Sequence, residues 1–343
     1  MFGPLAKQPQ LQAAFGEGLV LGITITVTII LVSSLTAILY HMGVMQRVVY
    51  VMARIMHGTM RTSGAESLAA AANVFVGQTE APLTVRPYLA KMTSSEVMAM
   101  MCGGMATIAG GVLAVYVSFG IDAGHLLAAS VMSAPAALAL AKVMVPETEQ
   151  SQTAAKVPLE IRKIDSNVLD AACRGASEGM KLSINVLAML IAFVALLALV
   201  NGLLNGSYQW VAGMFMDETA DPGTLRLETI LGWLMAPLMW LMGIPWGEAQ
   251  LVGGLVGLKT VATEFLAFLQ LRDLRAELSP RTFTIATYAL CGFANFASIA
   301  IQIGGISALE EGIRPKLAKL GLLALVGGTL AALMTAAVAG MLT

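Results

Sequence analysis

The chain has 343 residues, of which 57% are hydrophobic and only 12% are charged. Soluble domains carry about 25% charged residues, so this composition predicts a helical protein that crosses a membrane several times. The 20 basic and 21 acidic residues nearly cancel, which excludes the basic surface that DNA or RNA recognition requires. Neither the three cysteines nor the three histidines form a zinc motif, and we expect the cysteines to be free thiols.

Six stretches are long and apolar enough to cross the bilayer, since a transmembrane helix needs about 20 such residues. In chain order they are residues 18–40, 97–121, 126–145, 182–200, 282–309 and 320–342. Residues 229–247 contain Trp233, Trp240 and Trp246 and are typical of a helix at the membrane interface, where indole rings are well placed. The charged stretch 146–181 predicts a cytoplasmic connector.

Two further apolar stretches are interrupted in the middle by polar residues and by glycine or proline. Residues 67–89 contain GQTEAP, and residues 249–271 contain GLKTVATEF. Within the hydrocarbon region, non-helical backbone persists only where it is buried in protein or lines a cavity. Each stretch therefore predicts a re-entrant hairpin of two half-helices that meet at a tip. Most basic residues then fall on the cytoplasmic side, which places the first hairpin there and the second on the outer side.

The two hairpins belong to an internal repeat. Residues 65–89 and 247–271 both have Glu at the second position and both reach Thr-Glu, and MCGGMATIAG (101–110) parallels LCGFANFASI (290–299). Three crossings separate the two units, so their orientations in the membrane are opposite. Inverted repeats with broken helices are typical of secondary transporters. We therefore predict an all-α integral membrane protein with two re-entrant hairpins and broken transmembrane helices.

The repeat divides the chain into five expected parts, named here in order. They are an N-terminal span and cytoplasmic interfacial helix of a scaffold (1–63), the first hairpin with two spans (64–146), the connector (147–181), a scaffold span with an outer interfacial helix (182–245), and the second hairpin with two spans (246–343).

Glu80 and Glu264 lie at membrane depth, where an ionisable side chain costs about 2.5–3.5 kcal/mol and is by default functional. The neutral polar residues near them in the repeats are Asn73, Gln78, Thr79, Thr107, Asn295 and Ser298. Such a lining suits a ligand that carries several hydroxyl or amide donors. Phe293 offers a flat apolar face that either stacks on a ring of the ligand or simply packs.

A second polar group is found in the first repeat. Side-chain oxygens of Asn73 and Thr107, together with backbone carbonyls near Val76 and Ile108, suit a hard cation such as sodium. The alternative is that these groups bond to one another. Lys259 lies close to the second tip and has three possible roles, which are snorkelling to the interface, an ion pair with Glu264, and contact with the substrate.

Other classes of function lack their signatures. No nucleophile, metal triad or activating histidine accompanies the two glutamates, which argues against an intramembrane enzyme. No phosphate-binding GxxxxGK[ST] loop is present, which argues against ATP-driven transport. A channel needs a continuous polar pore, whereas two hairpins that enter from opposite sides favour alternating access.

Five segments together resemble the concentrative nucleoside transporters. They are AAANVFVGQTEAPL (70–83), MCGGMATIAGGVLA (101–114), KVMVPETE (142–149), GLKTVATEF (257–265) and CGFANFASI (291–299). The resemblance implies a homotrimeric symporter that imports nucleosides such as uridine, cytidine or adenosine with sodium, or with protons in some bacterial branches. It also implies an integral protein of the bacterial cytoplasmic membrane, with no organic cofactor.

The same resemblance implies roles for individual residues. The base would be contacted by Gln78, Thr79, Glu80 and Val112, with Phe293 beside it. The ribose hydroxyls would be bound by Glu264, Asn295 and Ser298. The sodium ion would be bound by Asn73, Val76, Thr107 and Ile108.

The chain departs from the family pattern in two ways. Thr263 precedes Glu264, where the family usually has asparagine, and this difference bears on substrate selectivity. Family members usually have further helices before the first span of this chain. Because those helices lie outside the inverted repeat, we expect the transport core to be complete.

Overall fold

The computed structural model describes residues 17–151, 153, 165–215 and 223–343. Within these residues the regular structure is entirely helical, with no strand. The start of the expected scaffold, before residue 17, and residues 152 and 154–164 of the expected connector lie outside the described residues.

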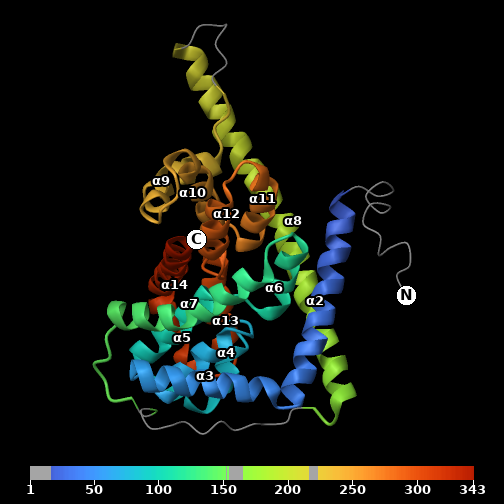
Figure 1. Cartoon of the computed structure of the whole chain (residues 1–343), viewed down its shortest axis with the longest axis vertical. Helices are drawn as coiled ribbons and strands as arrows, with labels where there is room; N and C mark the ends of the chain where they lie inside the picture. The colour runs from blue at the N-terminus through green and yellow to red at the C-terminus, as the bar shows by residue number, and fades with distance from the viewer. Residues whose placement is uncertain (1–16, 152, 154–164, 216–222) are drawn as a thin grey trace.

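The helices form two series with the same order of elements. The first comprises α2 (Glu17–His41), α3 (Val44–Met60), α4 (Gly64–Asn73), η2 (Ala81–Lys91), α5 (Ser94–Ala106), α6 (Gly110–Ser118) and α7 (Ala123–Met144). The second comprises α8 (Val168–Phe215), α9 (Leu227–Leu241), α10 (Trp246–Val261), α11 (Glu264–Asp273), η3 (Leu274–Ala276), α12 (Pro280–Leu290), α13 (Phe296–Ser307), η4 (Glu311–Ile313) and α14 (Arg314–Leu342). In Figure 1 the first hairpin lies in the lower part of the molecule and the second in the upper part. The predicted inverted-repeat architecture is confirmed.

Both predicted hairpins are present. In the first, α4 begins with a capping box in which Ser63 and Glu66 satisfy each other's backbone N–H groups. The returning arm, η2, is a 3₁₀ helix that contains Pro82 and Pro87, whose missing N–H groups do not fit a regular α-helix. In the second hairpin, α10 and α11 meet at a short tip where Thr263 caps the first turn of α11.

The span after each hairpin is broken at membrane depth, and the two breaks touch. The first break separates α5 from α6 and the second separates α12 from α13. The backbone N–H of Phe293 donates to the carbonyl of Thr107 across the contact, at 3.3 Å. Gly292 has a φ of +128°, and a Cβ there would lie 2.8 Å from the carbonyl oxygen of Ala106. Glycine is therefore required at this close approach of the two backbones.

The structure differs from the predicted spans in the second scaffold segment. The expected span 182–200 is only the middle of α8, which has 48 residues and extends into the expected connector. The first turns of α8 lie before the apolar span and carry charged side chains. Ion pairs stabilise this part of the helix, because Arg174 pairs with Glu178 one turn later and with Asp165 just before the helix. The hydrogen bond from Arg174 holds the pKa of the Asp165 carboxyl below its usual value.

The expected interfacial segment 229–247 is also two elements rather than one. α9 ends at Leu241, and α10 begins at Trp246 after a bend of 119°. Trp240 and Trp246 flank this bend with their rings 6.4 Å apart in an edge-to-face arrangement. Proline at position 245, just before α10, favours this new helix start.

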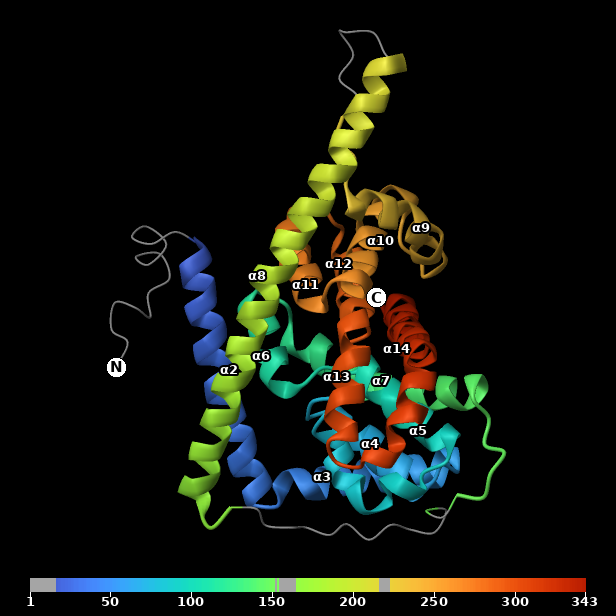
Figure 2. The same ribbon diagram turned by 180° about the vertical axis from the view of Figure 1, so that it is seen from behind.

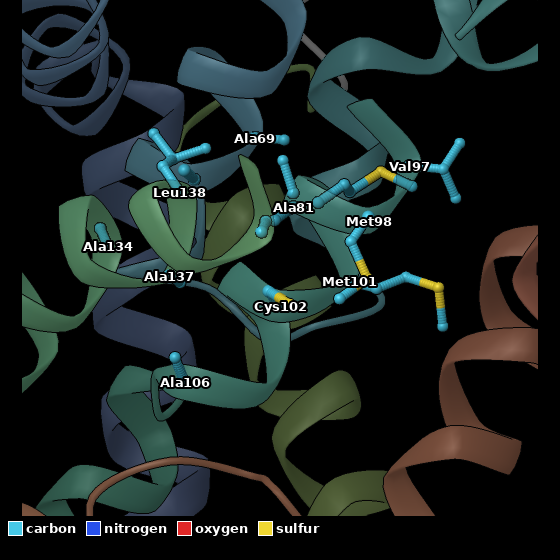
Figure 3. Packing of buried hydrophobic residues seen from close by; sticks show 14 of the residues in the cluster. Ala69, Ala81, Val97, Met98, Met101, Cys102, Ala106, Ala134, Ala137 and Leu138 are labelled. Atoms are coloured by element: carbon cyan, nitrogen blue, oxygen red, sulfur yellow. The ribbon is translucent and has the colours of Figure 1, made fainter. Parts of the chain in front are cut away.

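The first hairpin is held against α5 and α7 by small and flexible apolar side chains (Figure 3). Ala69 of α4 and Ala81 of η2 are fully buried, as are Met98 and Cys102 of α5 and Ala137 of α7. Lipid is as apolar as these side chains, so their stabilising effect comes from close packing, which small residues permit. This packing fixes the position of the first tip relative to the first break.

Helices α2 and α8 lie side by side along most of α2 (Figure 1 and Figure 2). Their contact depends on two glycines of α8, which are one helical turn apart. A Cβ at Gly175 would lie 2.6 Å from the carbonyl oxygen of Ser33, and a Cβ at Gly179 would lie 2.8 Å from the Cα of Ile30. The backbones of the two helices are thus in direct contact.

We expect Gly175→Ala to lower the thermal stability of the detergent-solubilised protein, measured by tryptophan fluorescence. Overpacking typically costs about 1–3 kcal/mol, which exceeds the gain of up to about 1 kcal/mol from replacing glycine by alanine in a helix. Gly202→Ala is the matched control, because nothing lies within 4 Å of a Cβ at that position of α8. Equal midpoints of thermal unfolding for Gly175→Ala and Gly202→Ala would contradict this account of the contact between α2 and α8.

Candidate functional site

The second hairpin tip and the second helix break meet at Glu264. This residue opens α11 and is 6% exposed, and its Oε2 accepts a hydrogen bond of 2.9 Å from Nδ2 of Asn295. Asn295 in turn caps α13, because its Oδ1 accepts from the backbone N–H of Ser298 at 2.9 Å. Two helix N-termini, which carry partial positive charge, therefore lie beside the buried carboxylate.

Tyr116 supplies the second hydrogen bond to the carboxylate. Its hydroxyl donates to Oε1 of Glu264 at 3.1 Å, and its ring stacks on Phe268 with the centroids 4.2 Å apart. Tyr116 is fully buried in α6. The sequence analysis did not identify it, because it is one aromatic residue within an apolar span. The only available signal was its hydroxyl, since a buried tyrosine usually has a hydrogen-bond partner.

Gln78 connects the first hairpin tip to the same region. Its Nε2 donates to Oγ of Ser298 at 3.0 Å, and its Oε1 accepts from Nε2 of Gln302 at 3.0 Å. Gln302 also bonds to the carbonyl of Met101 and was likewise missed from the sequence. A Cβ at Gly104 would lie 2.9 Å from the Cβ of Gln78, so the glycine makes room for this side chain.

A continuous line of hydrogen-bonded polar residues therefore crosses from one repeat to the other, with the link from Asn295 to Ser298 made to the backbone N–H of Ser298. In order, its members are Tyr116, Glu264, Asn295, Ser298, Gln78 and Gln302. Four of these residues were identified from the sequence, and the structure brings all four together. In chemical terms the line offers one carboxylate, three carboxamides and two hydroxyls for hydrogen bonding in the buried centre.

The other predicted substrate residues lie around this line without joining it. Thr79 packs its methyl group against Gly305 of α13, where a Cβ would lie 2.5 Å away. Glu80 is exposed, and the one hydrogen bond to its carboxylate among the described residues comes from the N–H of Gly77. Val112 is buried in the first turn of α6, and Phe293 is half-buried against the outer part of the core.

The predicted cation ligands lie together at the first tip and first break. Asn73 is the last residue of α4 and is 1% exposed, yet neither Oδ1 nor Nδ2 has a hydrogen-bond partner. Thr107 donates its hydroxyl hydrogen to the carbonyl of Gly103, which leaves the oxygen lone pairs available. The carbonyls of Val76 and Ile108 accept no hydrogen bond from a described residue. The corner thus offers oxygen ligands, as a hard cation requires.

Lys259 does not snorkel towards the interface. It is 1% exposed in the last turn of α10, and its Nζ donates to the carbonyl of Ala289 at 3.1 Å. No ion pair between Lys259 and Glu264 occurs among the described residues, although the two charges lie within electrostatic range. The snorkelling and ion-pair interpretations are therefore wrong.

Comparison with known proteins gives a consistent result over both halves of the chain. Residues 125–340 match the family model described as the C-terminus of Na+ dependent nucleoside transporters, and residues 23–123 match a model described as nucleoside recognition. The chain is 43% identical to the "Uncharacterized transporter YutK" of Bacillus subtilis, over 99% of this chain and 81% of that protein. It is 41% identical to "Sodium/nucleoside cotransporter 1" of Rattus norvegicus, over 96% of this chain and 52% of that protein.

Solved structures of CNTnw are also similar. The inward-facing substrate-bound state has a TM-score of 0.90 and 44% identity, over 99% of this chain and 79% of that chain. A doubly substituted form in an outward-facing state has a TM-score of 0.90 and 43% identity, with the same coverage. The relatives are transporters and not enzymes, and the two structures show the same architecture with its site facing opposite sides of the membrane.

Proposed function

This chain belongs to the concentrative Na+-dependent nucleoside transporter family, and on that premise we propose that it imports nucleosides together with sodium by alternating access. The observation that carries the proposal is the polar line from Glu264 to Gln78, which joins the two hairpin tips through α13. A site made by both tips can be exposed to either side of the membrane when the unit that carries them moves.

The ribose would bind to the part of the line around Glu264. A ribose ring presents neighbouring hydroxyls, and each can donate to a carboxylate that retains free lone pairs beyond its bonds to Tyr116 and Asn295. Ser298 would add a hydroxyl partner when its bond to Gln78 is exchanged for one to substrate. A charged hydrogen bond of this kind contributes about 1.5–3 kcal/mol.

The base would lie towards the first hairpin tip. Gln78 can bond to the edge of a base through both carboxamide atoms, and Phe293, which lies within the second break, can present its ring there. The remaining contacts would be Thr79, Glu80 and Val112. Because Glu80 is exposed and bonded within its own tip, it would join the site by turning towards the bound base.

Sodium would bind at the corner formed by Asn73, Val76, Thr107 and Ile108. A buried polar atom without a partner costs about 1–3 kcal/mol, and a cation bound to Oδ1 of Asn73 would remove that cost for the oxygen. α4 and α5 both end at this corner, so their partial negative charges also favour a cation. Ordering the first tip in this way would strengthen nucleoside binding, and the linkage is reciprocal.

The transport cycle would use the five parts of the chain in different ways. Residues 1–63 and 182–245 would form the scaffold of a homotrimer in the bacterial cytoplasmic membrane, and residues 64–146 and 246–343 would move with the substrate. Residues 147–181 would connect the two units. The long α8 supports this division, because its apolar side chains Leu196, Leu199 and Leu203 are exposed to lipid or to another subunit.

Proton coupling is the alternative for the driving ion. It is favoured by Glu80, an exposed carboxylate at the first tip that takes no part in the polar line. A proton carried by this residue would order the same tip as sodium would.

We expect Glu264→Gln to weaken uridine binding by about 10- to 100-fold, because a neutral amide replaces the charged acceptor. The measurement is isothermal titration of the purified protein with uridine. Glu277→Gln is the matched control, since Glu277 is an exposed carboxylate that follows η3, the short helix after α11. Wild-type affinity in Glu264→Gln would remove Glu264 from the binding site.

We further expect uridine to bind more tightly in sodium chloride than in choline chloride at the same ionic strength. Asn73→Leu should abolish this difference, because the variant loses the side-chain oxygen of the cation corner, whereas the exposed Asn167→Leu should retain it. Identical wild-type affinity in the two salts would contradict sodium coupling. An affinity that instead rises only on acidification would favour the proton alternative.

A further inference from the structure

The second hairpin contains a buried positive charge that the proposed binding site does not use. Lys259 is 1% exposed and makes one hydrogen bond among the described residues, from Nζ to the carbonyl of Ala289. Its charge is not neutralised by a paired carboxylate there. A buried ammonium is costly unless its surroundings compensate the charge, so its location requires a physical reason.

The ammonium lies at the C-terminal end of α12, and the residue that carries it lies near the C-terminal end of α10. α12 ends at Leu290, so the backbone carbonyl of Ala289 is one of the last four carbonyls of that helix. These carbonyls have no hydrogen-bond partner within the helix. Lys259 itself is in the last turn of α10, which ends at Val261. The C-terminal ends of helices carry partial negative charge, and two such ends at one point attract a cation.

The first repeat has the same arrangement of elements without a charge of its own. α4, the first arm of its hairpin, ends at Asn73, and α5, the first half of its broken helix, ends at Ala106. The Asn73 carboxamide lies against the last turns of α5, where a Cβ at Gly103 would be 3.3 Å from Nδ2. Here the residue between the two helix ends is neutral, and both of its polar atoms lack partners.

We propose that the ammonium of Lys259 is a built-in cation of the second repeat, occupying the position that the transported cation occupies in the first. The inference rests on the proposed function, because it takes the Asn73 corner as the site of the exchangeable ion. The first hairpin then depends on an ion from solution for its order, whereas the second carries its cation permanently.

Lys259 is on this account a positioning residue. It holds the end of α12, immediately before the break that carries Phe293 and Asn295, and it lies five positions before Glu264 across the tip. Its charge also offsets that of the Glu264 carboxylate, within whose electrostatic range it lies. Lys259 therefore helps to position the residues that bind the substrate, and it does not touch the substrate itself.

The test compares Lys259→Met, which removes the charge at similar volume, with Lys259→Asn, which places a neutral carboxamide of the Asn73 type in this hairpin arm. Uridine binding is titrated over a range of sodium chloride concentrations, with choline chloride holding the ionic strength constant. We expect Lys259→Met to bind uridine about tenfold or more weakly at every sodium concentration. In Lys259→Asn, a second sodium ion should replace the ammonium, so that affinity recovers at high sodium and the sodium dependence becomes steeper than in the wild type.

Lys319→Met is the matched control, because Lys319 is exposed on α14. Wild-type affinity in Lys259→Met would overturn the inference. So would a Lys259→Asn variant that is as weak as Lys259→Met, with no steeper sodium dependence, since Lys259 would then act only through packing and capping. Failure of the proposed function is distinguishable, because in that case the unaltered protein itself would show no sodium-dependent uridine binding.

Discussion

Two helices of this protein are interrupted at membrane depth, and each interruption leaves backbone N–H and C=O groups that lipid cannot satisfy. The protein satisfies part of this requirement by placing the two interruptions against each other. Phe293 donates across the contact to Thr107, and Gly292 lets the backbones approach to a distance that any side chain would prevent. The remaining free groups are what make the centre of the molecule suitable for polar ligands.

The position of the hairpins follows from the same constraint. Each tip lies beside the break of its own repeat, so helix ends from six elements are concentrated in one region, namely those of α4, α5, α10, α11, α12 and α13. Helix N-termini surround Glu264 and suit a carboxylate, whereas helix C-termini surround Asn73 and Lys259 and suit cations. The substrate site, the proposed ion site and the buried lysine are in this view consequences of one arrangement of helix ends.

The interrupted helices were predictable because interruption changes the composition of an apolar run, and Gln78, Glu264, Asn295 and Ser298 were recognisable as polar groups at those interruptions. Tyr116 and Gln302 were not, since one polar residue in a continuous apolar helix produces no periodic signal. The direction of the Lys259 side chain depends on Ala289, which is distant in sequence and becomes its neighbour only in the fold. Likewise, the extension of α8 beyond the bilayer depends on local pairs such as Arg174 with Glu178, which hydropathy does not measure.

The central claim is that an ion gradient drives nucleosides through a site shared by the two hairpins. It is tested most directly by uptake of labelled uridine into proteoliposomes under an inward sodium gradient, an inward proton gradient, or neither. We predict accumulation above equilibrium with the sodium gradient alone. Accumulation that requires only the proton gradient would contradict the sodium site at Asn73, and the absence of uptake for any nucleoside under either gradient would contradict the account as a whole.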